Sequence, residues 1–213
     1  MARDELRADV YELLGTLLHE PTESLFESLA SGGVGRVLEA ALQRLAPPAL
    51  GTLASPPPTL ADLKRAYWDA FVDPMAPRVV PVESVYRPWS ESPGEETGMG
   101  AAKGYLLSDR ALHLLELYRA LGVAVPDGFE AMPDNLALEL EFMGLLCRDR
   151  SPEDQAQFLR DHLDWLDRLA EDARGRQIPR FYSAVLDLAA SFSRWDALHA
   201  TGGLPQGVAA WDS

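Results

Sequence analysis

The fold of this chain follows from one segment, Met132-Pro-Asp-Asn-Leu-Ala-Leu-Glu-Leu-Glu-Phe-Met-Gly-Leu-Leu-Cys147. Pro133 suits the first position of a helix, where a missing N–H costs nothing, and Asp134 then places a carboxylate at the positive end of the helix dipole. The apolar side chains fall into two wedges on opposite sides of the helix axis. The wedges are Leu136, Leu140, Met143 and Cys147, and Leu138, Phe142 and Leu145. A helix with two apolar faces has neighbours on both sides, so we predict the central helix of an all-α bundle.

Other segments of the chain also show the helical period, with apolar residues spaced by three and four positions. They are residues 4–18, a short segment ending at Ala30, and residues 37–45, 59–73, 111–121, 151–175 and 179–195. Thr59 and Ser151 are typical N-cap residues for the helices that follow them. We therefore predict one all-helical domain over residues 1–200 and a flexible, Gly-rich tail over residues 201–213.

Residues 73–103 show no helical period, and we name this segment the connector. A connection of this length in a compact domain is usually functional or disordered. The first half, through Val79–Trp89, is apolar and aromatic, which predicts packing along the bundle. The second half contains Glu91, Glu95 and Glu96 among small residues, which predicts a mobile acidic lip. The sequence therefore predicts a long functional loop between mid-chain helices.

The composition limits the classes of partner. The formal net charge is −14, so the surface repels nucleic acid and anionic membranes and attracts cationic partners. A single cysteine, Cys147, allows no internal disulfide and fits a reducing compartment. The N-terminal segment is charged, and no apolar run is long enough to span a membrane. We expect a cytoplasmic protein with no nucleic-acid partner and no stable membrane insertion.

The sequence carries no recognisable catalytic or metal-binding motif. The four histidines, His19, His113, His162 and His199, show neither a Glu-x-x-His pair nor the Cys/His spacing of zinc sites. No nucleotide-binding Gly-rich loop occurs, and Ser84 lacks the Gly-x-Ser-x-Gly surroundings of a hydrolase nucleophile. We therefore expect no catalytic residues, no metal, no cofactor and no enzymatic activity.

Several short motifs occur in an order that points to a known family. They are Tyr67-x-x-Ala70-Phe71, Pro81-Val-Glu-Ser-Val-Tyr86, Pro133-Asp-Asn-Leu136 followed by Glu139-Leu-x-Phe-Met143, and His162-Leu-x-Trp165 followed by Phe181-Tyr182. In order and spacing they resemble the TorD/DmsD/NarJ family, the cytoplasmic chaperones of molybdoenzymes. The resemblance covers roughly residues 60 to 195.

The resemblance implies a TorD-like helical bundle. It also implies a system-specific chaperone that recognises the N-terminal leader, often a twin-arginine signal peptide, of a molybdopterin-containing catalytic subunit and holds that subunit until its cofactor is inserted. Family members have been linked to guanine nucleotide, for which this chain shows no motif. The family's usual Pro-Asp-His reads Pro133-Asp134-Asn135 here, and its usual Leu-Phe reads Ala70-Phe71. Asn cannot take up a proton near neutral pH, which puts any pH-switch role of Asn135 in doubt.

A twin-arginine leader offers two guanidinium groups and an apolar run, so its receptor needs carboxylates beside an apolar groove. We predict that groove between the connector and the central helix. The predicted peptide-binding residues are Tyr67, Phe71, Glu83, Tyr86, Trp89, Asp134, Asn135 and Glu139. Replacing Asp134 by Ala is then expected to weaken leader binding with little change in melting temperature.

Two other functions fit the sequence. One is a helical metal- or cofactor-binding enzyme that uses Glu139, Glu141 and His162, and the other is a structural adaptor subunit that stays in its complex. The client enzyme is not identified by any residue. Exchange of helices through the Pro/Gly hinges would allow a domain-swapped dimer as well as a monomer.

Overall fold

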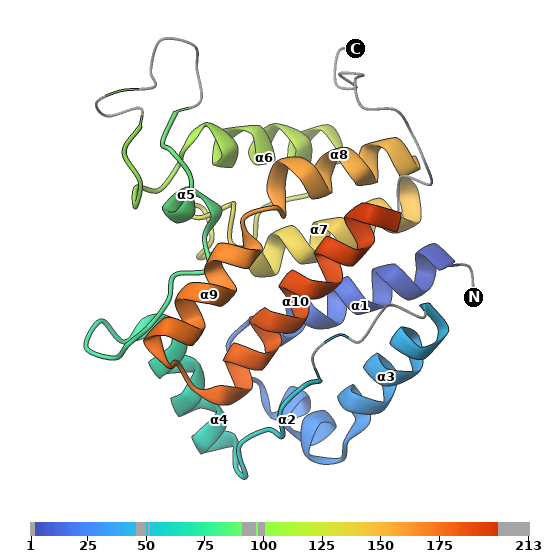
Figure 1. Ribbon diagram of the computed structural model, residues 1–213, viewed down its shortest axis with the longest axis vertical. Coiled ribbons are helices and arrows are strands. Elements are labelled where there is room, and N and C mark those ends of the chain that lie inside the picture. Colours follow the sequence, from blue (N-terminus) through green and yellow to red (C-terminus); the bar gives the residue numbers. More distant parts are fainter. Residues whose placement is uncertain (1–2, 46–49, 51, 91–96, 98–100, 200–213) are drawn as a thin grey trace.

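The structure is a computed structural model that describes residues 3–45, 50, 52–90, 97 and 101–199. These residues form a helical bundle without β-strands (Figure 1), which confirms the all-α prediction. The helices are α1 (Arg3–Leu17), α2 (Glu23–Ala30), α3 (Gly33–Leu45), α4 (Leu60–Tyr67), α5 (Glu83–Tyr86), α6 (Asp109–Ala120), α7 (Leu136–Asp149), α8 (Pro152–His162), α9 (Leu166–Arg176) and α10 (Arg180–His199), with a π-helical turn η1 (Trp68–Val72) after α4. The predicted tail, residues 201–213, lies outside the described residues.

Helix α7 is the central helix that its two apolar faces predict. Leu136, Leu140 and Met143 are fully buried, and Phe142 on the other face is 4% exposed. Helix α1 packs antiparallel to α7, with Gly15 opposite Ala137 and Gly144 opposite Ala8. A Cβ atom on Gly15 would lie 2.9 Å from the carbonyl oxygen of Ala137, closer than two such atoms can approach. The two glycines therefore set the distance between the helix axes.

The start of α7 differs from the prediction. Pro133 and Asp134 precede the helix, and Asn135 is its N-cap, whose side-chain oxygen accepts a hydrogen bond from the backbone N–H of Ala137 at 3.0 Å. The reason lies in the connector, which takes the backbone groups at this point. The N–H of Leu136 donates to Pro81 O at 2.9 Å, and the carbonyl of Asp134 accepts from Glu83 N–H at 3.0 Å.

The prediction of one helix over residues 151–175 is also wrong. The Ser151 cap is confirmed, since its Oγ accepts from the N–H of Asp154 at 3.2 Å, but α8 ends at His162 and α9 begins at Leu166. The indole N–H of Trp165 donates to the freed carbonyl of His162 at 2.9 Å. This bond satisfies a helix-end acceptor while Trp165 enters the core.

A buried group of polar side chains joins α1, α8 and α10. The buried guanidinium of Arg7 on α1 donates from Nε to Asp196 Oδ1 of α10 at 2.6 Å and from Nη1 to Gln155 of α8 at 2.6 Å. Tyr11 adds a bond from its hydroxyl to Asp196 at 2.9 Å.

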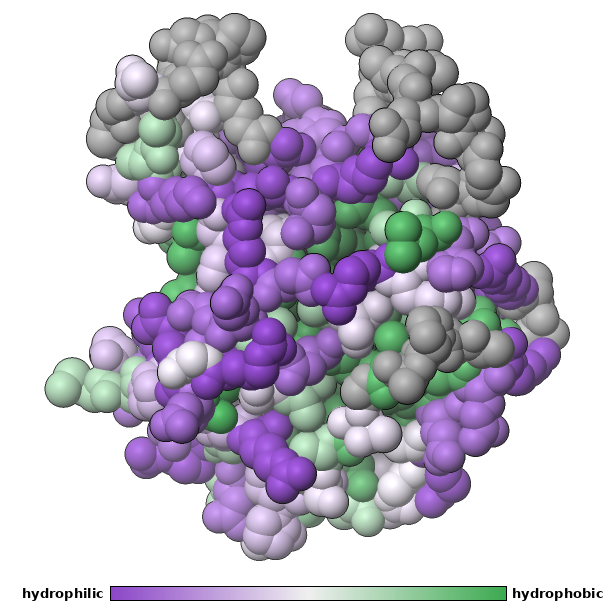
Figure 2. Space-filling model, viewed as in Figure 1, coloured by the Kyte–Doolittle hydropathy of each residue, from purple (hydrophilic) through white to green (hydrophobic). Residues whose placement is uncertain are grey.

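Hydrophilic residues cover much of the face drawn in Figure 2. No described helix combines the length and the apolar character that a membrane span needs.

Candidate functional site

The connector lies against the N-terminal end of α7. Val82 forms an isolated antiparallel bridge with Asn135, flanked by the two backbone hydrogen bonds described above, in which Pro81 O accepts and Glu83 N–H donates. Val79 and Val82 are buried, so the predicted packing of this half of the connector along the bundle is confirmed. One prediction was incomplete, because a short helix, α5, interrupts the segment that lacks a helical period. Helix α5 directs Glu83 and Ser84 toward the core.

Asp134 fastens the connector rather than the start of a helix. Its Oδ2 accepts a hydrogen bond from the backbone N–H of Ser84 at 2.7 Å and a second, short one from the Ser84 hydroxyl. The Ser84 hydroxyl also lies 2.8 Å from the hydroxyl of Ser108, the N-cap of α6. Burial raises the pKa of Asp134, and the bonds from Ser84 offset part of that rise. The contact therefore joins the connector, α6 and α7.

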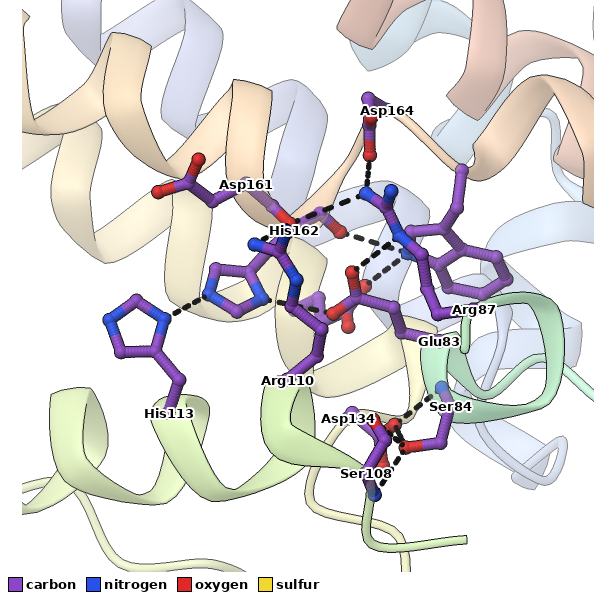
Figure 3. Close-up of polar contacts among 12 residues, drawn as sticks. Glu83, Ser84, Arg87, Ser108, Arg110, His113, Asp134, Asp161, His162 and Asp164 are labelled. Atoms are coloured by element: carbon purple, nitrogen blue, oxygen red, sulfur yellow. Dashed lines mark hydrogen bonds and ion pairs between the residues drawn. The ribbon is translucent and has the colours of Figure 1, made fainter. Parts of the chain in front are cut away.

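A row of three side chains crosses the interior beside this contact (Figure 3). Glu83 Oε2 lies 2.9 Å from His162 Nδ1, and His162 Nε2 lies 2.9 Å from His113 Nδ1. Burial lowers the pKa of His162 to about 3, and burial raises the pKa of Glu83 to about 8. At neutral pH the imidazole is neutral and the carboxyl mostly protonated. The Glu83 O–H then donates to His162 Nδ1, and the His162 Nε2–H donates to His113.

Glu139 of α7 completes the cluster from the other side. The indole N–H of Trp165 donates to Glu139 Oε2 at 3.1 Å. Glu139 is fully buried, and burial together with the neighbouring Glu83 carboxylate raises its pKa well above the usual value. Its other oxygen, Oε1, accepts no N–H donor among the described residues. Oxygen or nitrogen atoms of Glu83, Glu139 and His162 lie within 4.8 Å of one another, an arrangement able to hold a cation.

Two arginines border the cluster. Arg87 donates from Nε to Glu83 Oε1 at 3.2 Å and forms an ion pair with the half-exposed Asp164. Arg110 donates to the backbone carbonyl of Asp161 at 3.2 Å. Both guanidinium groups lower the pKa of Glu83, against the larger effect of burial. The cluster is thus a group of buried polar side chains, and Arg87 connects its member Glu83 with Asp164 at the surface.

The structure brings together five of the predicted peptide-binding residues: Glu83, Tyr86, Asp134, Asn135 and Glu139. Tyr86 belongs to this group because its ring stacks on Trp165 at a centroid distance of 5.3 Å, and its hydroxyl donates to Asp172 at 3.0 Å. The three carboxylates in the group, however, are fully buried. They cannot contact a ligand at the surface unless the connector moves.

The other predicted residues lie elsewhere. Tyr67 and Phe71 pack against Tyr182 of α10, with ring centroids 5.8 and 5.1 Å from it. Trp89, at the end of the apolar half of the connector, is 38% exposed. The acidic lip formed by Glu91, Glu95 and Glu96 lies outside the described residues.

The alternative constellation of Glu139, Glu141 and His162 is not formed. The Glu141 carboxylate pairs with His19 Nε2 at 2.8 Å, on the side of α7 that faces the end of α1. Glu141 also borders an apolar pocket of about 190 Å³ between α6 and α7, whose lining includes Tyr118, Val125, Leu138, Phe142 and Leu145. Glu83, which the alternative did not include, takes the place of Glu141 beside Glu139 and His162.

Sequence reasoning missed part of the cluster. His113, Arg87, Arg110 and Ser108 were not proposed as site residues. Trp165 appears only in the family resemblance, and His162 appears there and in the alternative enzyme site with Glu139 and Glu141. The members come from the connector, α6, α7, α8 and the α8–α9 turn, so no single motif contains them. The one available signal was the occurrence of titratable residues on otherwise inward-facing positions, such as Glu139 between the two apolar wedges.

Two comparisons with known proteins gave matches. A family model described as the nitrate reductase delta subunit matches residues 31–171. One similar solved structure is from Archaeoglobus fulgidus and carries the provisional description of a redox enzyme maturation protein. It is 20% identical, with a TM-score of 0.49, over 91% of this chain and 94% of that one. The curated proteins give no significant match.

Proposed function

Because this chain belongs to the nitrate reductase delta subunit family, the family of NarJ/TorD-type chaperones, we propose that it is the maturation chaperone of one molybdopterin-containing oxidoreductase. In this role it binds the N-terminal leader of the catalytic subunit and holds the subunit until its cofactor is inserted. Family membership supports the maturation role. The leader as the bound segment, and the twin-arginine signal in particular, are part of the proposal.

The observation that carries the proposed binding is a group of exposed apolar side chains where the connector meets α6. Its members, which we name the connector-end surface, are Trp89, Tyr105, Leu106, Leu107 and Leu112. Backbone hydrogen bonds hold this region together, from Trp89 N–H to Ala102 O at 2.9 Å and from Asp109 N–H to Trp89 O at 3.0 Å. Exposed large apolar residues gathered in one region are typical of a surface that binds another protein.

A leader with two arginines and an apolar run matches this surface in chemistry. The apolar run would bury the connector-end surface, and the protein's net charge of −14 attracts the guanidinium groups. Asp164, whose side chain is half exposed and paired with Arg87, is a carboxylate for which a leader arginine could compete. The buried Glu83, Asp134 and Glu139 then have a different role from the one predicted: they hold the connector in place.

The proposal is tested first by affinity capture of the full chain from its native cells, followed by mass spectrometry. We expect one large molybdopterin-dependent subunit, captured in the form that lacks cofactor. A synthetic peptide of that subunit's N-terminus is then titrated by fluorescence anisotropy. Capture of the cofactor-loaded subunit in a lasting complex would instead favour the adaptor function.

A matched pair of variants locates the binding surface. Leu112→Ser changes an exposed leucine of the connector-end surface on α6, and Leu198→Ser changes an exposed leucine near the end of α10. Loss of one buried leucine contact weakens binding by about tenfold, whereas the control leaves affinity unchanged. Equal affinity of both variants and wild type would place the leader elsewhere on the molecule.

A further inference from the structure

Three buried side chains from three separate elements converge in the interior of the protein. Glu83 comes from α5, Glu139 from α7 and His162 from α8, and each side chain is fully buried. One ligand atom of each lies within 4.8 Å of the other two. A carboxylate, a second carboxylate and a neutral imidazole form a donor set typical of zinc and related divalent transition-metal ions.

We propose that Glu83, Glu139 and His162 form a binding site for a divalent metal ion of the zinc class. The proposal goes beyond the chaperone function and does not depend on it. The observation that points to a ligand is Glu139 Oε1, a fully buried oxygen that accepts no N–H donor among the described residues. In the absence of an ion, a proton shared with the neighbouring Glu83 carboxyl group is what satisfies this oxygen. A metal ion at the centre of the three side chains would take the place of that proton.

The contacts around the three side chains are those that metal ligands usually have. His162 offers Nδ1 to the centre while its Nε2 bonds to His113 at 2.9 Å. Glu139 offers Oε1 while its Oε2 accepts from Trp165 at 3.1 Å. Glu83 offers Oε2 while its Oε1 accepts from Arg87 at 3.2 Å. Each ligand is thus oriented by a bond to its outer atom, as in metal sites whose ligands are fixed by a surrounding shell.

The charges around the site permit a dication. Two carboxylates balance the two positive charges of the ion. Beyond them, Arg87 is shared between Glu83 and Asp164, and Arg110 is a second positive charge near the site. The carboxylate of Asp134 is a further negative charge that acts on both Glu139 and Glu83 and opposes the effect of Arg110. Zinc lies about 2.0–2.2 Å from each ligand, so its donors are roughly 3.3 Å apart. Glu83 Oε2 and His162 Nδ1, now 2.9 Å apart, would therefore move slightly apart, whereas donor atoms that are up to 4.8 Å apart would close in by up to about 1.5 Å.

Such an ion would tie the connector to two helices of the bundle. Glu83 is on the connector, and the other two ligands are on α7 and α8. The backbone bonds of the connector to residues 134 and 136 are already made without the ion. A bound ion would add a link to α8 and so stabilise the closed position of the connector. Three protein ligands leave the fourth tetrahedral position for a water molecule.

The test uses the full chain, first stripped of metal with a chelator and then titrated with Zn²⁺ alone. We expect one Zn²⁺ per chain and a higher melting temperature in its presence. Co²⁺ in place of Zn²⁺ is expected to give visible absorption bands of a four-coordinate site. The ring nitrogens of His162, followed by ¹⁵N NMR of the wild-type protein, are expected to shift with stoichiometric Zn²⁺.

Two variants separate this site from surface carboxylates. Glu139→Gln keeps the side-chain shape and an acceptor for Trp165 but removes the anionic ligand. Glu12→Gln removes a surface carboxylate that pairs with Arg148. We expect Glu139→Gln to bind Zn²⁺ at least about 100-fold more weakly and Glu12→Gln to bind it as wild type does. Wild-type protein that ignores millimolar Zn²⁺, or that binds it without any change at His162, overturns the proposal whether or not Glu139→Gln folds.

Discussion

Replacement of Asp134 by Ala is expected to destabilise the protein, in contrast to the expectation from the sequence. Asp134 is fully buried, and its Oδ2 accepts the backbone N–H of Ser84 at 2.7 Å together with the Ser84 hydroxyl. In the variant the hydroxyl keeps Ser108 as a partner, but the N–H loses its acceptor. The connector then loses the side-chain contact that fastens it to the residue before the N-cap of α7.

The magnitude follows from these contacts. A buried donor left unpaired costs about 1–3 kcal/mol, and the space vacated by the carboxymethyl group adds about 1 kcal/mol. Part of this loss in stability is recovered, because the variant no longer has to bury a carboxyl group. The cost of that burial is evident in Asp134, where desolvation is the largest effect on the pKa. We expect a net loss of about 2–3 kcal/mol in the free energy of unfolding. For a chain of this size that is a fall of roughly 5–10 °C in Tm.

The measurement is urea denaturation and thermal melting followed by circular dichroism, with two companion variants. Asp134→Asn keeps an oxygen that can accept from Ser84 and is expected to lose less than about 1.5 kcal/mol. Asp167→Ala removes an exposed carboxylate paired with Arg194 and is expected to change stability by less than about 1 kcal/mol. An Asp134→Ala protein that melts with the wild type would refute the assignment of this residue as the anchor of the connector.

Two further predictions concern the core. The pKa of Glu83 rises from 4.5 to about 8 on folding, so the folded state holds the proton more tightly and stability falls as pH increases toward 8. Between pH 6.5 and 8 we expect Glu83 to contribute a loss of about 1–2 kcal/mol, and Glu83→Gln removes that contribution. His162, with its pKa lowered to about 3, acts only at more acidic pH. Gly15→Ala places a Cβ 2.9 Å from a carbonyl of α7 and should cost about 1–3 kcal/mol in urea titrations. Gly35→Ala, with open space around it, should gain up to about 1 kcal/mol.

Local patterns in the sequence predicted the helices because helical period and capping are properties of neighbouring residues. The apolar wedges of α7 and the caps at Thr59 and Ser151 are examples, and all are confirmed. The errors occur where distant segments compete for the same backbone groups. Pro133 and Asp134 have good helix-start chemistry, but the connector takes the N–H of Leu136 and the carbonyl of Asp134, which moves the start of α7 to Leu136.

The buried cluster could not be predicted from local sequence patterns, because its contacts also join segments that are distant in the sequence. Glu83 and His162 are separated by 79 positions, and their contact depends on how the connector crosses α7. The sequence placed the connector beside α7 correctly, through the family resemblance and the apolar Val79–Trp89 half. It could not show that the carboxylates would turn inward. A carboxylate on a partly apolar segment has the same sequence signature whether it faces solvent or a buried partner.

Burial of Glu83, Asp134 and Glu139 has a consequence for how a client could act on this protein. The connector is held to the bundle by these residues on its inner side, and the connector-end surface with Trp89 belongs to the same chain segment and to the start of α6. Arg87 links the buried cluster to the protein surface at the α8–α9 turn, because it contacts the buried Glu83 and the half-exposed Asp164 at once. A leader arginine that competes for Asp164 would free Arg87 and change the electrostatic environment of Glu83. Client binding at the surface and the protonation or metal occupancy of the interior are therefore expected to be coupled, and by thermodynamic linkage each must influence the other to the same extent.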